Sequence, residues 1–262
     1  MKPSVLVKNL ACIGLWLIAG QALPEPLIAP TAIDWLLDCP FPAQERPDPE
    51  VLERTQCASV NVPRDYAAPK RGSVRLALTR VGARQPLSRE GVVFIQGGEP
   101  PKGQGATFAL HLTSRWESYA TQAYRTLTNR YDVIELSPRD LSQPSGVEQA
   151  ARDMEYVRAQ LGEAQLNYLG NAQATRLGSR YAALFPERVA RMVLVNAEQA
   201  EPVAAGIEQL LLKEPAQPGT AAGCINRWVG DFLVFGKQPP ASTRCLDPVS
   251  YTHLTLPTSD LV

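Results

Sequence analysis

The sequence predicts an α/β protein, with a mainly parallel sheet and helices on both faces of that sheet. The first observation is a stretch that reads as strand, sharp turn, helix and strand, from Leu166 to Ala197. The second is the alternation of short continuous apolar runs, typical of buried parallel strands, with helical segments. The third is length, because 262 residues are ample for a buried core, in one large domain or two smaller ones.

The first elements after the N-terminus are two antiparallel strands, over residues 57–66 and 72–80, joined by a turn rich in proline and glycine. Buried strands follow over residues 91–98 and 131–137, and the segment 107–129 between them contains helical turns. Strands that alternate with helices in this way are connected by right-handed crossovers in a parallel sheet.

The clearest amphipathic helix spans Val147 to Leu161, and Gly162 ends it. Its apolar face consists of residues three or four positions apart: Val147, Ala150 or Ala151, Met154, Val157 and Leu161. Four charged residues are expected to point outward: Arg152, Asp153, Glu155 and Arg158.

A sharp turn follows this helix. The strand 166–169 ends at Gly170, the helix 174–185 is stopped by Pro186, and a second strand spans 191–195. A strand that leads through a glycine turn into a helix is the context of the nucleophile elbow, G-x-S-x-G. Here the motif reads Gly170-Asn171-Ala172-Gln173-Ala174. Alanine cannot supply the activated hydroxyl that covalent acyl transfer requires.

The string NYLGNAQATRLGSRYAALFPERVARMVL, at 167–194, resembles the α/β-hydrolase superfamily, specifically its secreted proline-iminopeptidase and tripeptidyl-aminopeptidase type. Such enzymes read NYLG-x-S-x-G-T-x-LG-x-x-YA-x-x-FP-x-x-V-x-RMVL-x-G. The flanks match, and the departures are Ala172 and Ala174. The family's V-x-VP-x-DY and G-x-x-x-LAL segments also have counterparts here, at 60–66 and 72–78. The resemblance implies an α/β-hydrolase core and a family activity of peptide or ester hydrolysis.

The resemblance also implies an oxyanion hole, with backbone N–H donors near Gly98 and at Gln173. The segment 97–100 reads GGEP where the family has GGPG, and the carboxylate of Glu99 would repel a developing oxyanion. A plain strand-ending turn is an equal alternative for the paired glycines. The segment 137–142 replaces D-x-RG-x-G-x-S and keeps only Arg139 of its arginine–glycine pair.

The acid and base of a triad are missing, since they should follow the nucleophile in the order Asp or Glu, then His. The only downstream histidine is His253, within a tail that resembles a translated sequencing adapter; an ordinary threonine-rich strand is the alternative. Thr175 and Ser179 are expected inside the helix, where neither replaces the missing serine.

Met1 to Ala22 has the charged start, the apolar run of about ten residues and the small residues of a secretory signal peptide. Its apolar run is too short to span a membrane. Removing Cys12 with this segment leaves four cysteines, which permit three pairings. Proximity in the sequence favours the pairs Cys39–Cys57 and Cys224–Cys245. Each disulfide would stabilise the folded protein by roughly 3 kcal/mol. Their spacing matches no zinc pattern, so we expect no metal.

The expected organisation is a signal peptide at 1–22, a hydrolase core at 23–202, the start of a helical cap at 203–248 and a non-native tail at 249–262. The cap is predicted to begin with two helices between Glu208 and Phe235, and the last strands of the core are expected to be absent.

The alanine at the nucleophile position, Ala172, decides the predicted function. We expect a secreted or periplasmic relative of serine exopeptidases that is inactive as written. The alternatives are a non-catalytic module that binds a ligand or protein, a decayed copy, and a hydrolase with unrecognised catalytic groups. Lysine and arginine balance aspartate and glutamate at 26 each and are spread along the chain, which argues against nucleic acid. A small peptide or ester ligand fits the family, and no cofactor is expected.

Overall fold

The computed structural model describes residues 33–41, 48–97, 108–119, 121–137, 139–197, 206–213 and 222–240. All of these lie in one compact unit, residues 31–262, and the description concerns that unit. The predicted signal peptide, Gly98, Cys245 and the tail from residue 249 lie outside the described residues.

The described chain forms an eight-stranded sheet with the order β1-β2-β3-β5-β4-β6-β7-β8. The strands are β1 (Asp34–Trp35), β2 (Thr55–Pro63), β3 (Ser73–Val81), β4 (Gly91–Gln96), β5 (Tyr131–Leu136), β6 (Leu166–Asn171), β7 (Val189–Val195) and β8 (Glu208–Leu212). Pairing is antiparallel from β1 through β3 to β5, and it is parallel from β5 through β4, β6 and β7 to β8. The predicted α/β class is therefore confirmed.

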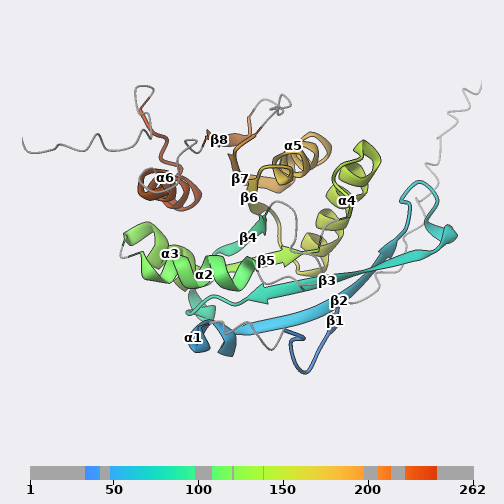
Figure 1. The fold of residues 1–262 in the computed structure, drawn as a ribbon, viewed down its shortest axis with the longest axis horizontal. Helices are drawn as coiled ribbons and strands as arrows, with labels where there is room; N and C mark the ends of the chain where they lie inside the picture. Colours follow the sequence, from blue (N-terminus) through green and yellow to red (C-terminus); the bar gives the residue numbers. More distant parts are fainter. Residues whose placement is uncertain are drawn as a thin grey trace, which may run out of the picture. The chain divides into compact units, whose positions relative to one another are not determined.

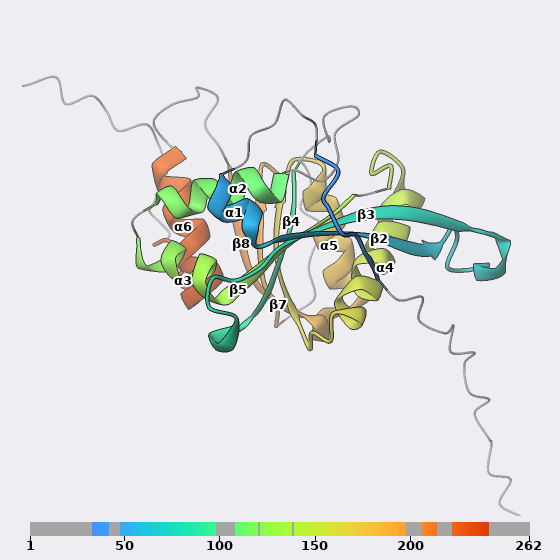
Figure 2. The same cartoon turned by 90° about the horizontal axis from the view of Figure 1, so that it is seen from below.

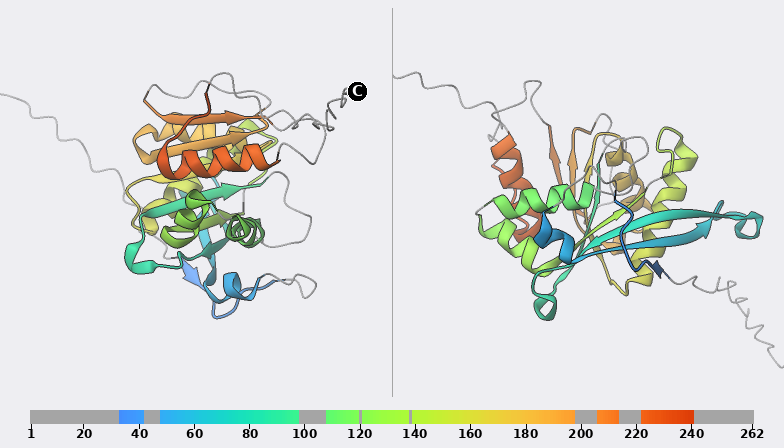
Figure 3. Two further views of the ribbon diagram at one scale, coloured as in Figure 1. Left: turned by 90° about the vertical axis from the view of Figure 1, so that its left-hand side faces the viewer. Right: turned by 60° about the horizontal axis from the view of Figure 1, so that its bottom comes forward.

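Helices cover both faces of the sheet (Figures 1 and 3). They are α1 (Pro49–Glu53), α2 (Phe108–Ser118), α3 (Gln122–Arg130), α4 (Pro144–Gln160), α5 (Ala174–Leu184) and α6 (Ala222–Phe235). One apolar core lies between the sheet and the α4–α5 layer, and a second lies under α2, α3 and α6. Every residue of β4 and β5 is buried, which explains the continuous apolar run of β4, whereas β5 also buries two carboxylates, Asp132 and Glu135.

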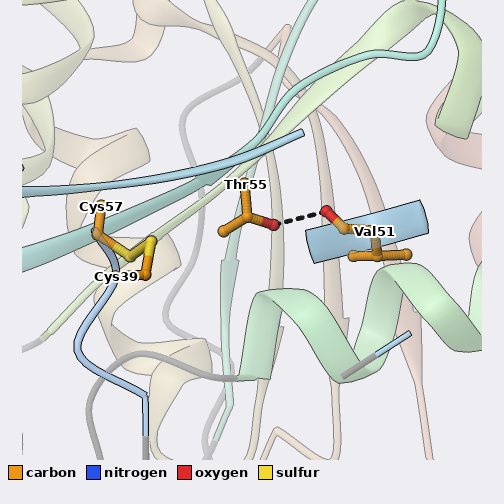
Figure 4. The surroundings of a disulfide bond; sticks show 4 residues. All are labelled: Cys39, Val51, Thr55 and Cys57. Carbon is orange, nitrogen blue, oxygen red and sulfur yellow. Dashed lines mark hydrogen bonds between the residues drawn. A yellow bond between two sulfur atoms is a disulfide. The ribbon is translucent and has the colours of Figure 1, made fainter. Parts of the chain in front are cut away.

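Strands β2 and β3 form a long antiparallel hairpin, paired from Thr55–Val81 to Pro63–Ser73. Figure 2 shows its far end extending past α4. A disulfide between Cys39 and Cys57, with Cα atoms 5.1 Å apart, ties the segment after β1 to this hairpin (Figure 4). This predicted pairing is confirmed. Cys224 is also disulfide-bonded, and because Cys245 lies outside the described residues, the second pairing stays a prediction.

The helix predicted at 147–161 is α4, and Gly162 ends it as expected, with φ +74°. The N–H of Gly162 donates to the carbonyl of Ala159 and the N–H of Glu163 to that of Arg158, which is a Schellman motif. The outward placement of Asp153 and Arg158 was wrong, because both are buried. Each is paired: Asp153 with Arg139, and Arg158 with Glu155.

The prediction of a cap that begins with two helices is wrong for the part that the structure describes. Glu208–Leu212 forms β8, which pairs in parallel with β7 from Arg191–Glu208 to Val195–Leu212. Arg191 bonds Glu208 at 2.8 Å and also donates to the carbonyls of Leu233 and Val234 in α6. Three consecutive leucines fit an edge strand as well as a helix, so local pattern alone misassigned this segment.

Two glycines enclose the ring of Tyr168 in β6. A Cβ atom on Gly178 would lie 2.4 Å from the Tyr168 ring, and one on Gly170 would lie 2.6 Å from it. The ring is fully buried, and its hydroxyl donates to the carbonyl of Ala174 at 2.8 Å. The glycines before and within α5 therefore permit close contact between strand and helix.

We expect Gly178→Ala to lower the free energy of unfolding by about 1–3 kcal/mol, because the added methyl overpacks the Tyr168 ring. Helix propensity alone would make the alanine variant more stable by about 1 kcal/mol. A loss of stability would therefore indicate overpacking against the ring. Urea unfolding measures it. The double variant Tyr168→Leu/Gly178→Ala should show a favourable coupling energy, and strict additivity would contradict the contact.

Candidate active site

The predicted strand–turn–helix around Ala172 is present. Strand β6 ends at Asn171, Ala172 has the left-handed backbone angle φ +51°, and α5 begins at Ala174. Left-handed conformations are uncommon for residues other than glycine, asparagine and aspartate, and they concentrate at functional turns. The turn lies at the carboxyl end of the parallel strands, where open α/β sheets bind ligands.

Hydrogen bonds from both sides hold the turn. The N–H of Ala172 donates to the carbonyl of Val195 in β7 at 3.0 Å. The carbonyl of Ala172 accepts the N–H of Thr175 at 3.0 Å and its hydroxyl at 2.7 Å. Thr175 and Ser179 are both buried inside α5, as predicted. Since the Thr175 hydroxyl is engaged with the turn itself, it does not face a bound substrate.

Asn196, directly after β7, lies beside the turn. Its side-chain amide donates to the Asn171 side chain at 3.0 Å, and its N–H donates to the Leu212 carbonyl at 2.9 Å. It is the second residue other than glycine with positive φ among the described residues, at +56°. Asn196 stands where the resembling family has glycine, and asparagine tolerates the left-handed region better than most residues.

Of the two predicted oxyanion donors, Gln173 lies among the described residues and Gly98 does not. Gln173 is exposed at the N-terminal end of α5, where the first backbone N–H groups have no intrahelical acceptor. Gly98 lies outside the described residues, so its role stays a prediction. Gly97 is described, and a Cβ atom there would lie 3.3 Å from the Phe108 ring at the start of α2.

Arg139, which the resemblance singled out, takes part in a buried polar network. Its guanidinium bonds both carboxylate oxygens of Asp153, at 2.6 and 2.9 Å, and donates to the carbonyls of Pro63 and Arg64. The Tyr66 hydroxyl donates to Asp153 at 3.0 Å. Burial raises the pKa of Asp153, and the Arg139 guanidinium opposes that rise. The network joins α4 to the hairpin, so these family-like residues act in structure and not in chemistry.

Sequence reasoning missed Glu135, a buried carboxyl near the end of β5. Its Oε2 accepts the N–H of Ala109 in the first turn of α2 at 2.8 Å. Burial raises the pKa of Glu135 to about 7, against the lowering by backbone N–H groups of Ala109 and Phe108. The carboxyl thus anchors the start of α2.

The remaining predictions concern histidine, metal and membrane. His111 is exposed on α2, and His253 lies outside the described residues. In the described ranges, no group of three or more His, Cys, Asp or Glu is arranged to hold a metal ion. A search of the same ranges finds no helix with the length and apolar character needed to cross a membrane.

Sheet order, flanking helices and the turn after β6 together define an α/β hydrolase. The chain belongs to the alpha/beta hydrolase fold family, whose model matches residues 105–235.

Its relatives are of the peptidase type. The tripeptidyl aminopeptidase of Streptomyces coelicolor is 27% identical over 226 residues, which cover 67% of this chain and 40% of that protein. The serine protease Hip1 of Mycobacterium tuberculosis is 40% identical over 83 residues, which cover 31% of this chain and 16% of the relative. The chain thus spans less than half the length of the relatives it matches. Among solved structures, the juvenile hormone epoxide hydrolase of the silkworm Bombyx mori aligns over 55% of this chain and 36% of its own, with a TM-score of 0.39 and 14% identity.

Proposed function

We propose that this chain is a non-catalytic relative of the secreted serine exopeptidases, which keeps the hydrolase scaffold but performs no acyl transfer. The observation that carries the proposal is the turn at Ala172. Its backbone has the left-handed conformation of a nucleophile elbow, yet its side chain is a methyl group. A methyl group has no proton to lose and no lone pair with which to attack a carbonyl carbon.

The burial of other hydroxyls supports inactivity. Thr175 and Ser179 are each 2% exposed, and the Thr175 hydroxyl already donates to the Ala172 carbonyl. A nucleophile has to reach a bound substrate and be within hydrogen-bond reach of a base. Neither hydroxyl is accessible in that way, so neither is a substitute for the missing serine.

Export is part of the same proposal. The first 22 residues have the composition of a secretory signal peptide, and disulfides persist mainly outside the cytosol. The Cys39–Cys57 bond fits that environment. In the mature protein, the retained scaffold would offer a small peptide or ester a place at the carboxyl edge of the sheet without cleaving it.

A labelling experiment tests inactivity. The purified full chain should not react with a fluorophosphonate probe, nor turn over aminoacyl or ester substrates, because the turn carries no activated hydroxyl. Ala172→Ser should not restore fast hydrolysis, since triad members act as a unit. Its rate should not exceed the residual roughly 10³–10⁴-fold over water that an oxyanion hole and binding provide.

Two outcomes would contradict the proposal. Labelling of the unmodified chain that disappears in Thr175→Ala or Ser179→Ala would place the nucleophile inside α5. Turnover by Ala172→Ser that is lost on adding His253→Ala would show that His253 completes a triad.

A further inference from the structure

A cavity of about 270 Å³ lies on the β2–β3 hairpin, away from the elbow. Strand β3 is separated from β6 by β5 and β4, which amounts to about 14 Å at the usual strand spacing. The cavity is therefore not part of the candidate active site, and its interpretation does not rest on the proposed function.

The floor of this cavity is one face of the hairpin. Alternate residues of the two strands, such as Ala58 and Leu78, face the opposite side and pack into the core beneath α4 and α5. On the cavity side the register pairs Ser59 with Ala77 and Cys57 with Thr79. Small side chains at these positions leave space above the sheet.

The roof is the segment after β1, which is held in place covalently. Leu36, Pro40 and Phe41 line the cavity from above. The Cys39–Cys57 disulfide fixes this segment to the floor (Figure 4), and the Leu36 N–H donates to the Cys57 carbonyl at 2.9 Å. A space built between a pinned roof and a sheet is preformed, as ligand sites usually are.

The rim carries an exposed apolar residue and one unpaired charge. Leu36 lines the cavity and is 42% exposed. Arg75 lines the cavity and has no partner among the described residues. No acidic side chain belongs to the described lining.

We propose that this cavity binds an apolar group that carries a carboxylate at one end. A cavity of about 150 Å³ holds benzene, so this one has room for a phenyl ring and a short acid chain. The ring would lie between Phe41 and Ala77, and the carboxylate would pair with the Arg75 guanidinium. Two sources share this chemistry, namely a small aryl or alkyl carboxylic acid and the apolar C-terminal residue of a peptide.

Isothermal titration calorimetry on the oxidised full chain tests the proposal with 3-phenylpropionate and its neutral amide, 3-phenylpropanamide. We expect the acid to bind about 3- to 10-fold more tightly than the amide. Arg75→Gln should reduce the affinity for the acid to that for the amide. Ala77→Phe, which fills the cavity, should abolish binding of both. Arg71→Ala removes a charge from the same hairpin outside the cavity and should change nothing.

Equal affinity of the unmodified chain for the acid and the amide would overturn the proposal, as would binding that survives Ala77→Phe or no binding at millimolar concentrations. Arg75→Gln is an exposed substitution, so it remains informative if Ala77→Phe fails to fold. N-acetyl-alanyl-phenylalanine and its C-terminal amide form the second arm. Tighter binding of this free peptide acid than of 3-phenylpropionate assigns peptide C-termini as the ligand, and weaker binding assigns small carboxylic acids.

Discussion

Replacing Arg139 with methionine is expected to lower the free energy of unfolding by about 3–5 kcal/mol, the usual result of removing one partner of a buried ion pair. The pair is well enclosed, since the Arg139 side chain is 11% exposed and that of Asp153 is 1% exposed. Without Arg139, the Tyr66 hydroxyl is the side-chain donor that remains hydrogen-bonded to the Asp153 carboxylate among the described residues.

Urea unfolding at pH 7 measures this loss, and Arg152→Met is the matched control. Arg152 lies one residue before Asp153 on the same helix and pairs with Glu148, with both side chains about one-third exposed. An exposed pair four residues apart contributes about 0.3–0.5 kcal/mol. Losses of similar size in the two variants would show that the Arg139 network contributes no more than a surface pair.

The second large effect is a fall in stability with rising pH that depends on Glu135. Its pKa is raised in the folded protein from 4.5 to about 7, so the folded state binds more protons than the unfolded state between these values. Stability from this group is therefore fully present below about pH 4.5 and is lost as the pH rises through 7. The difference corresponds to about 3 kcal/mol.

Glu135→Gln removes this titration and keeps an oxygen that can accept the Ala109 N–H. Between pH 5 and pH 8, we expect the variant to gain about 2.5 kcal/mol of stability relative to the unmodified chain, measured by urea unfolding at both values. Glu53→Gln, at an exposed carboxylate of α1, is the control and should follow the unmodified chain. Parallel pH profiles for Glu135→Gln and the unmodified chain would contradict the assignment.

The carboxylates of Asp153 and Glu135 also show which parts of the structure could be predicted from sequence and which could not. The strand at 91–96 was predictable because it is buried on both faces and reads as a continuous apolar run. The turn at 170–174 was predictable because its strand, glycine and helix signals are all local. The partners of Asp153 and Glu135 were not, since they come from the segment after β5, from the hairpin and from the first turn of α2.

The error at 208–212 has a similar origin. Three leucines in succession satisfy a buried helix and an edge strand equally well, and only the neighbouring β7 decides between them. The cavity over the hairpin had no sequence signal, because small residues on one strand face become a site only when another segment covers them. Its roof is set by a disulfide that was predictable from proximity alone.

The left-handed alanine at position 172 has a consequence for protein engineering. Its conformation is set by the carbonyl of Val195 on one side and by the first turn of α5 on the other, and not by the side chain it carries. This chain has the left-handed turn with a methyl group at position 172 in place of a hydroxyl, so it separates the backbone geometry of the elbow from the reactive side chain that an active hydrolase carries there.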